Sequence, residues 1–268
     1  MNANVVEPTV ADVFGDALSA EDERLSVVAP DTETIEALVG SVDDDSPSVR
    51  LLATSDTLKT AMSDFLLASR AADRIEAGQL DIRVSSEGSN ALLLTETSVV
   101  ALVRADDRVA GLTADDESFI ESANERFATA WSDADTYSLR TPSLARVRET
   151  LEAELGTDTT EDFESVIDSL GSVRGDDGLD EVEVSLLVAA RNDELLYDVS
   201  KWGEDIGIAS KATFSRTKTR MEDADILDTE KVPIEVGRPR LRLKLATDRL
   251  EAAEPDRLAE LTLSLLER

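Results

Sequence analysis

Hydrophobic positions in the first 140 residues form short apolar runs that alternate with stretches of helical spacing. A short apolar run bounded by turn residues predicts a buried strand, and apolar positions three or four residues apart predict a helix. The predicted strands are, in chain order, 25–30, 49–55, 80–86, 91–97, 98–104 and 108–113. The predicted helices begin at the cap Asp31 or Thr32, run from the cap Asp56 to Ala77, and run from Glu117 to Trp131. This order predicts an α/β domain with a mixed, partly parallel sheet over residues 1–140.

From Thr141 onward the pattern changes to helices. Thr141 and Pro142 have the pattern of a helix cap followed by a first-turn proline, and helical spacing continues to Leu155. A second short helix is predicted at 163–170. Residues 171–178 (GSVRGDDG) lack the Lys-Ser/Thr of a phosphate-binding loop, so we interpret them as a connector. The second domain, residues 141–268, therefore begins with a helical connector.

A helix-turn-helix is predicted between residues 180 and 225. The apolar spacing indicates helices over 180–196 and 199–206, and a glycine turn follows at 207–209. Ser210 is a good N-cap for a third helix that ends near Asp225. This succession of elements is typical of the motif that inserts its last helix into the major groove of DNA.

A β-hairpin is predicted directly after the third helix. Its strands are 228–236 and 240–246, and its turn is Gly237–Pro239. In the second strand, leucines alternate with basic residues, so the leucines bury one face while the cations line the other. A hairpin with a basic tip in this place is a wing, and the domain is predicted to be a C-terminal winged helix-turn-helix.

Basic and hydroxyl side chains gather on one side of the third helix. At 100° per residue, Phe214, Thr217 and Met221 fall on the side that packs inward. Residues 207–221 include four basic residues and no acidic one, and Arg, Ser and Thr are residues that bind base edges and phosphates. The residues predicted to bind double-stranded promoter DNA are Lys211, Ser215, Arg216, Lys218, Thr219 and Arg220 in the helix, and Arg238, Arg240, Arg242 and Lys244 in the wing.

The composition excludes most kinds of catalytic site. Without Cys or His there can be no disulfide, no Cys/His zinc site, no thiol nucleophile and no Ser–His–Asp triad. With 58 acidic residues, neighbouring carboxylates occur by chance and do not indicate catalysis. We therefore expect no enzyme, no catalytic residue, no metal site and no cofactor. An enzyme on the N-terminal α/β domain stays as an alternative, although the sequence has no recognisable nucleophile–base set.

The charge is strongly negative. The chain has 58 Asp and Glu against 27 Lys and Arg, a net charge of −31, and the basic residues are 21 Arg and only 6 Lys. An acidic surface in which Arg largely replaces Lys is expected of a cytoplasmic protein in molar salt, where screening lowers self-repulsion. An ordinary acidic protein from low salt is the alternative. The first thirty residues contain one basic residue, Arg24, and no secretory apolar segment, so we expect a cytoplasmic protein without a membrane contact.

The last domain resembles the winged helix-turn-helix of archaeal and bacterial transcription regulators. The residues that carry this resemblance are Ser210, Ser215–Arg216, Met221, Ala224–Leu227 and Gly237–Pro239. The whole chain resembles the haloarchaeal regulators of the TbsP type, which are similar in plan to the TrmB regulators of sugar metabolism. This second resemblance rests on VRLLATS (49–55), DIRVSS (81–86), ALLLTET (91–97) and RVAGLTADDESFIESANERFATAW (108–131).

The resemblance implies a sequence-specific transcriptional regulator of central sugar metabolism genes. The 108–131 stretch is similar to the tail of phospholipase-D-like sensor domains, which implies an α/β effector or dimerisation domain rather than a lipase. TrmB proteins of this plan carry the DNA-binding part first, whereas here it is C-terminal. A protein-interaction adaptor, whose winged helix binds a partner at promoters, is the alternative from another class.

Polar residues follow two of the predicted parallel strands. Thr54, Ser55 and Asp56 come after one strand, and Ser85 and Ser86 after the next. Ligands of open α/β sheets bind beyond the carboxyl ends of strands, so these residues are candidates to bind a small-metabolite effector. A sugar phosphate or another central metabolite would suit the family resemblance. Ordinary caps and turns are the alternative interpretation.

The last helix, 255–268, has an apolar stripe. Leu258, Leu261 and Leu265 lie at helical spacing, with Leu263 and Leu266 nearby. The stripe has two interpretations, a dimer seam and packing within the chain. A homodimer is expected in either case, because symmetric regulators bind two half-sites about 34–36 Å apart.

Overall fold

The computed structural model describes residues 4–18, 24–29, 31–85, 90–170, 178–235 and 237–266. The chain divides into two compact units. Unit 1 comprises Met1–Ser63 and Leu67–Leu139, and unit 2 comprises Asp64–Leu66 and Arg140–Arg268. The predicted connector at 171–178 lies, except for its last residue, outside the described residues.

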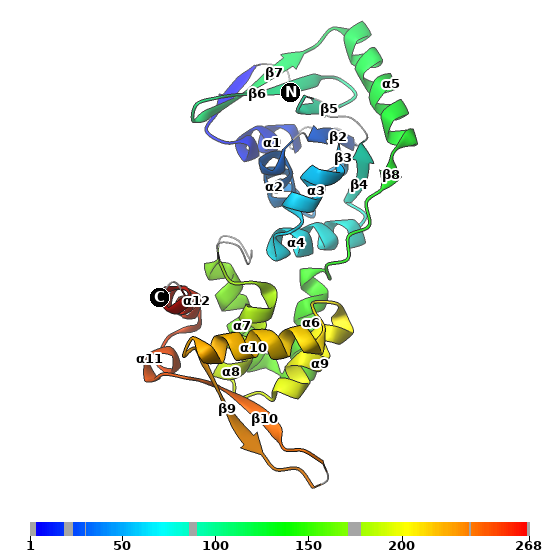
Figure 1. Cartoon of the computed structure of the whole chain (residues 1–268). Helices are drawn as coiled ribbons and strands as arrows, with labels where there is room; N and C mark the ends of the chain where they lie inside the picture. The colour runs from blue at the N-terminus through cyan, green and yellow to red at the C-terminus, as the bar shows by residue number, and fades with distance from the viewer. Residues whose placement is uncertain are drawn as a thin grey trace. The chain divides into compact units, whose positions relative to one another are not determined.

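Unit 1 contains a sheet of eight strands in the order β1-β7-β6-β5-β2-β3-β4-β8 (Figure 1). The strands are β1 (Val5–Glu7), β2 (Arg24–Ala29), β3 (Ser48–Thr54), β4 (Leu80–Ser85), β5 (Leu92–Leu94), β6 (Val99–Ala105), β7 (Arg108–Ala114) and β8 (Asp135–Thr136). Strands β2, β3 and β4 pair in parallel, and every other pairing in the sheet is antiparallel. The predicted mixed, partly parallel sheet is confirmed. Both β1 and the short β8 escaped the sequence analysis.

Helices cover both faces of this sheet. They are α1 (Val10–Leu18), α2 (Thr32–Ser41), α3 (Ser55–Ala61), α4 (Phe65–Glu76) and α5 (Glu117–Asp133). The face that carries Leu25, Val27 and Leu51 packs against α1 to α4 in one apolar core. On the opposite face, Leu52 and Leu94 pack against Ile120, Phe127 and Trp131 of α5. This alternation follows from the two-residue period of a strand.

The single helix predicted from Asp56 to Ala77 is wrong, because the structure has two helices there. Helix α3 ends at Ala61 and α4 begins at Phe65. The break follows from hydrogen bonds of Ser63, whose hydroxyl and N–H both donate to the carbonyl of Thr60. Serine competes for backbone acceptors in this way and so interrupts helices.

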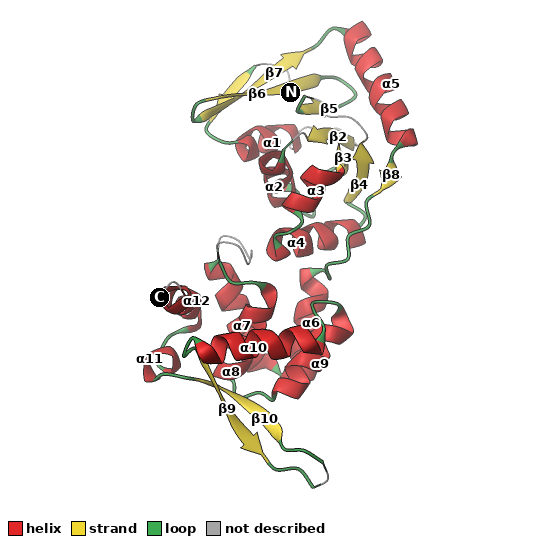
Figure 2. Ribbon diagram, in the orientation of Figure 1, coloured by secondary structure: helices red, strands yellow, loops and turns green. Residues whose placement is uncertain are grey.

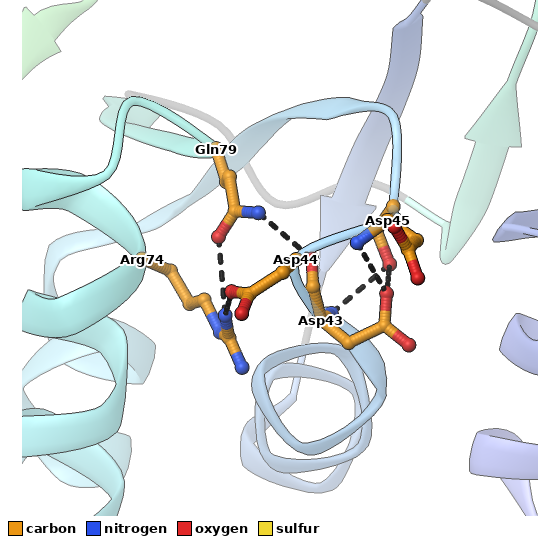
Figure 3. A network of polar contacts seen from close by, with 6 residues as sticks. Asp43, Asp44, Asp45, Arg74 and Gln79 are labelled. Carbon is orange, nitrogen blue, oxygen red and sulfur yellow. Dashed lines mark hydrogen bonds and ion pairs between the residues drawn. The ribbon is translucent and has the colours of Figure 1, made fainter.

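A polar network joins the loops that precede β3 and β4, at the amino-terminal edge of the parallel strands (Figure 3). Arg74 Nη1 lies 2.8 Å from Asp44 Oδ1 and 3.1 Å from Gln79 Oε1. Gln79 Nε2 donates to the carbonyl of Asp43, whose carboxylate accepts from the Asp45 N–H. The network links the ends of two neighbouring strands through exposed polar groups, and the Asp44 side chain is 94% exposed.

Unit 2 is a helical body with a two-stranded hairpin (Figure 2). Its elements are α6 (Leu144–Leu155), α7 (Thr157–Ser169), α8 (Glu181–Arg191), α9 (Leu196–Ile206), α10 (Lys211–Asp223), β9 (Leu227–Val232), β10 (Arg240–Leu245), α11 (Asp248–Glu251) and α12 (Pro255–Leu266). One apolar core joins them. The cap of α6 is Ser143, which accepts from the N–H of Arg146, so the predicted cap at Thr141 is wrong. Among the described residues, no helix is long and apolar enough to cross a membrane.

Helices α9 and α10 approach each other closely at Gly203. A Cβ at this position would overlap the ring of Phe214, a fully buried side chain of α10. The neighbouring Trp202 is also buried, and its indole N–H donates to the Thr150 hydroxyl of α6 over 3.0 Å. Glycine at position 203 of α9 thus lets α10 pack closely against α9.

The last helix packs within its own chain. Leu258 of α12 is fully buried, and the helix packs against α7. The other four leucines, which are Leu261, Leu263, Leu265 and Leu266, are half-buried against the same core. Packing within the chain therefore accounts for the apolar stripe predicted from the sequence.

We expect Gly203→Ala to destabilise unit 2 by about 1–3 kcal/mol, the usual cost of overpacking a close contact. Gly40→Ala is the matched control, because a Cβ at Gly40 of α2 would meet no atom within 4 Å. The control should unfold at the same or a slightly higher denaturant concentration, since alanine favours helices. The measurement is urea unfolding followed by circular dichroism. Equal midpoints for Gly203→Ala and the wild type would contradict the close packing of α9 on α10.

Candidate nucleic-acid interface

Local backbone chemistry sets the start of the last helix of the helix-turn-helix. Helix α9 ends at Gly207, which has φ 90° and ψ 15°, a left-handed conformation that glycine adopts at little cost. The Ser210 hydroxyl then accepts from the N–H of Thr213 at 3.2 Å, as an N-cap does. The predicted glycine turn and the predicted cap both lie where the sequence places them.

The two faces of α10 differ as the periodicity predicts. Phe214, Thr217 and Met221 are buried. The exposed residues of the helix are Lys211, Ala212, Ser215, Arg216, Thr219, Arg220 and Asp223. One exposed face therefore brings together five of the six predicted DNA-binding residues of this helix.

Lys218 lies elsewhere. It is only 9% exposed, and its ammonium lies 2.6 Å from Glu222 Oε2, one helical turn away. The position falls on the packed edge of the helix, so the aliphatic stem is covered and the charge is paired inside the domain. The structure does not bring Lys218 into the exposed face expected from the sequence.

Two exposed cations of α10 are paired with carboxylates of preceding helices. Lys211 Nζ lies 2.8 Å from Glu204 of α9, and this hydrogen bond raises the pKa of Lys211 and lowers that of Glu204. Arg220 lies 2.9 Å from Glu183 of α8. Burial raises the pKa of Glu183, although the backbone N–H of Asp180 and the guanidinium of Arg220 both donate hydrogen bonds to its carboxylate.

Arg216 differs from these neighbours. Its guanidinium donates only to the Thr213 hydroxyl, at 3.3 Å, and makes no ion pair with any described residue. It is exposed in the second turn of α10. Residues in the first turns of a recognition helix contact base edges, so this guanidinium is placed and free to do so.

The wing is the antiparallel hairpin of β9 and β10, with Arg240 opposite Val232 and Leu245 opposite Leu227. Arg238 lies exposed in the turn and makes no ion pair with any described residue. Leu243 and Leu245 are buried, so the predicted apolar face of the second strand is present.

The basic face of the second wing strand lies against acidic residues of the α8–α9 corner. Lys244 Nζ lies 2.6 Å from Asp193, and Arg240 lies 3.4 Å from Asp198. Arg242 is partly buried beside Leu195, which forms an isolated antiparallel bridge with it. Arg240 and Lys244 are therefore paired rather than free, although 37% and 35% of their side chains stay exposed, and the contact of this strand with DNA stays a prediction.

Three features of this surface escaped the sequence analysis. The bridge at Leu195 adds a third short segment beside β10, and the N–H of Leu243 donates to the carbonyl of Glu194 at 2.9 Å. Tyr197 of α9 is 47% exposed, and the guanidinium of Arg240 stacks 4.2 Å from its ring centre. Lys231 of β9 is a further exposed cation. The run NDELLYD at 192–198 was the available signal, but its partners lie about 45 residues later in the chain.

The predicted ligand residues of unit 1 lie at one edge of the sheet. Thr54 and Ser85 are directly opposite in the parallel pair β3–β4. The Thr54 hydroxyl is the N-cap of α3 and lies 2.9 Å from the Thr57 hydroxyl. Ser55 is half-buried, Asp56 is exposed, and Ser86 lies outside the described residues. Capping therefore accounts for Thr54. Across the described part of the chain, no group of three or more acidic residues is placed to hold a metal ion.

The order α8, Leu195 segment, α9, α10 and wing defines a winged helix-turn-helix protein. Family models described as TbsP-like transcriptional regulator, N-terminal, and TbsP-like transcriptional regulator, C-terminal HTH domain, match residues 2–142 and 143–263. The chain belongs to the family of TbsP-like transcriptional regulators. The resemblance inferred from the sequence is thus confirmed, and the family is one of transcriptional regulators with a C-terminal helix-turn-helix domain.

Solved structures similar to this chain share half of its length. TrmBL2, an archaeal chromatin protein with a novel mode of DNA binding, is 15% identical over 50% of this chain and 53% of its own, with a TM-score of 0.37. Nuc, a phospholipase D family member from Salmonella typhimurium, is 10% identical over 50% of this chain and 97% of its own, with a TM-score of 0.38. No curated protein matches the sequence.

We expect Glu204→Gln to raise the affinity for DNA by up to about fivefold, because it frees Lys211 from an exposed ion pair worth at most about 1 kcal/mol. Glu161→Gln of α7 is the control, since Glu161 is exposed and makes no ion pair with any described residue. Both variants change the net charge equally. Fluorescence anisotropy with a duplex selected by the wild-type protein measures the effect, and an equal gain in both variants would show that only net charge matters.

Proposed function

We propose that this chain is a sequence-specific regulator of central sugar metabolism genes, a cytoplasmic homodimer adapted to high intracellular salt. Residues 141–268 bind promoter DNA, and residues 1–140 form the effector and dimerisation domain. The observation that carries DNA reading is the exposed face of α10, where Arg216 stands without an acidic partner among the described residues. The assignment to sugar metabolism rests on the resemblance in plan to the TrmB regulators.

Arg216 is the residue best suited to read a base. A free guanidinium in the major groove binds the O6 and N7 atoms of guanine with two hydrogen bonds. Ser215 and Thr219 lie on the same exposed face and supply hydroxyls to bases or phosphates. Arg238, at the wing turn, carries a charge that reaches the backbone of the adjacent groove.

The charge distribution suits binding in concentrated salt. Residues 201–244 have ten basic and eight acidic side chains, a net charge of +2, whereas the rest of the chain carries −33. Counterion release drives most non-specific binding and shrinks as bulk salt rises. A surface with few free cations loses little of this contribution, and its specificity depends on base contacts and shape. The acidic remainder repels DNA and so disfavours binding in other orientations.

Arg216→Ala should lower the affinity for a selected duplex by about 1–3 kcal/mol and relax specificity at one base pair, because it removes a bidentate base contact. Arg238→Ala should weaken the binding of all DNA sequences alike and reduce the salt dependence of binding by about one phosphate contact. Titrations of each variant in 0.2 M and 2 M potassium chloride, with both the selected and a scrambled duplex, measure these changes.

Arg257→Ala is the control for these titrations, since Arg257 is an exposed arginine of α12 with no ion pair to a described residue. Its affinity should equal that of the wild type. Unchanged binding by Arg216→Ala and Arg238→Ala together would remove the proposed surface. Promoter occupancy in cells separates direct reading from an adaptor role, because occupancy that survives Arg216→Ala would require tethering by another protein.

The homodimer has its own test. Sedimentation equilibrium should give twice the chain mass of 29.0 kDa, and footprints should show two protected half-sites about 34–36 Å apart. A single protected half-site and a monomer mass at the concentrations used for binding would contradict it.

A further inference from the structure

Three arginines lie on adjacent strands of the unit 1 sheet, on the face that α5 covers. Arg24 belongs to β2, Arg50 to β3 and Arg83 to β4. The strand register places Arg50 beside Ser26 on one side and Asp81 on the other. The sequence pattern could not reveal this cluster, because it depends on the pairing of strands that are about 25 to 33 residues apart.

Two of these guanidinium groups stack on Trp131 of α5. The distance to the ring centre is 5.3 Å for Arg50 and 4.7 Å for Arg83, and Arg83 also donates to the Trp131 carbonyl at 2.8 Å. The stacking holds the cations in fixed orientations against one side of α5. Burial, followed by the repulsion of Arg24, lowers the pKa of Arg50, and Asp81 only partly offsets this.

Within the described part of the chain, Arg24 and Arg50 make no ion pair of the kind that the half-buried Arg104 and Arg191 make with carboxylates. Arg104 pairs with Asp31 at 2.8 Å, and Arg191 pairs with Asp162 at 3.0 Å. The repulsion between Arg24 and Arg50, which Asp81 offsets only in part at Arg50, falls when an anion binds both guanidinium groups.

Arg24 and Arg50 line a hollow of about 770 Å³. Its floor includes Arg24, Ser26 and Arg50, and its wall is the inner side of α5 with Ile120 and Phe127. The Asn124 amide donates to the carbonyl of Thr95 at 3.0 Å, which fixes the loop after β5 to α5 and keeps the wall in place. The volume is that of a small-molecule site.

The rim of the hollow is acidic, and this limits the kinds of ligand that can bind there. Its carboxylates are those of Glu96, Asp115, Glu117, Glu121 and Glu125, all exposed. They repel a bare anion or a polyanion such as DNA, and they accept hydrogen bonds without donating any. A ligand that fits both layers has an anionic group at one end and hydroxyl groups along its body.

We propose that the hollow between the sheet and α5 binds a small polyhydroxylated anion. Its phosphate or carboxylate group lies on Arg24 and Arg50, its hydroxyls donate to the rim carboxylates, and its C–H face packs on Phe127. This site lies toward the amino-terminal ends of β2 and β3, whereas Thr54 and Ser85 are the carboxyl-terminal residues of β3 and β4. It does not depend on DNA binding, so either proposal can fail alone.

Isothermal titration of the full chain tests the site with four probes, which are glucose 6-phosphate, gluconate, glucose and inorganic phosphate. We expect glucose 6-phosphate or gluconate to bind at least tenfold more tightly than glucose and inorganic phosphate. Arg24→Gln and Arg50→Gln should each weaken that binding at least about tenfold, because each removes a charged hydrogen bond. Arg126→Gln, on the exposed side of α5, is the matched control and should leave it unchanged.

Glu121→Gln tests the contribution of the carboxylate rim separately from that of the arginine floor. It replaces one acceptor oxygen by an NH2 donor and removes a repulsive charge, so it should weaken the binding of glucose 6-phosphate and strengthen the binding of inorganic phosphate. Arg24 is exposed, so Arg24→Gln should keep the fold even where Arg50→Gln does not. Failure of all four probes to bind, binding that survives both arginine substitutions, or equal affinity for glucose and glucose 6-phosphate would overturn the proposal.

Discussion

Ion pairs with carboxylates limit the number of free basic side chains in the described part of the winged domain. Most of the cations that the fold brings near α10 and the wing are already paired with carboxylates, as Lys211 is with Glu204 and Lys244 with Asp193. Such a cation must exchange a carboxylate for a phosphate when DNA binds, so it contributes only the difference between two ion pairs. On the DNA-binding surface proposed above, the net attraction therefore depends on arginines that make no ion pair with a described residue, such as Arg216 and Arg238, and on the fit of the helix in the groove.

The helix-turn-helix was predictable because its chemistry is local. A glycine that ends one helix, a serine that begins the next and the 3.6-residue spacing of Phe214, Thr217 and Met221 all act within a few residues of sequence. The alternation of the second wing strand acts over a similarly short range. These signals fix the order of elements and the inner face of α10, and the family models agree with the result.

Pairing between distant residues could not be predicted in the same way. Nothing in the sequence of the wing indicates that Asp193 and Asp198 face it. The hollow in unit 1 was even less predictable from the sequence, because its floor forms only when β2 and β3 pair in register. Sequence periodicity assigns a side chain to a face, whereas the partner on that face is set by topology.

The positions of the two tryptophans have a spectroscopic consequence. Trp131 lies under the stacked guanidinium groups of unit 1, and Trp202 lies in the core of unit 2, hydrogen-bonded to Thr150. Each unit therefore contains one tryptophan, and the two indole rings lie in surroundings of different polarity. Phenylalanine at one of the two positions leaves an emission signal from one unit alone, and so makes the behaviour of each half visible within the intact chain without any attached dye.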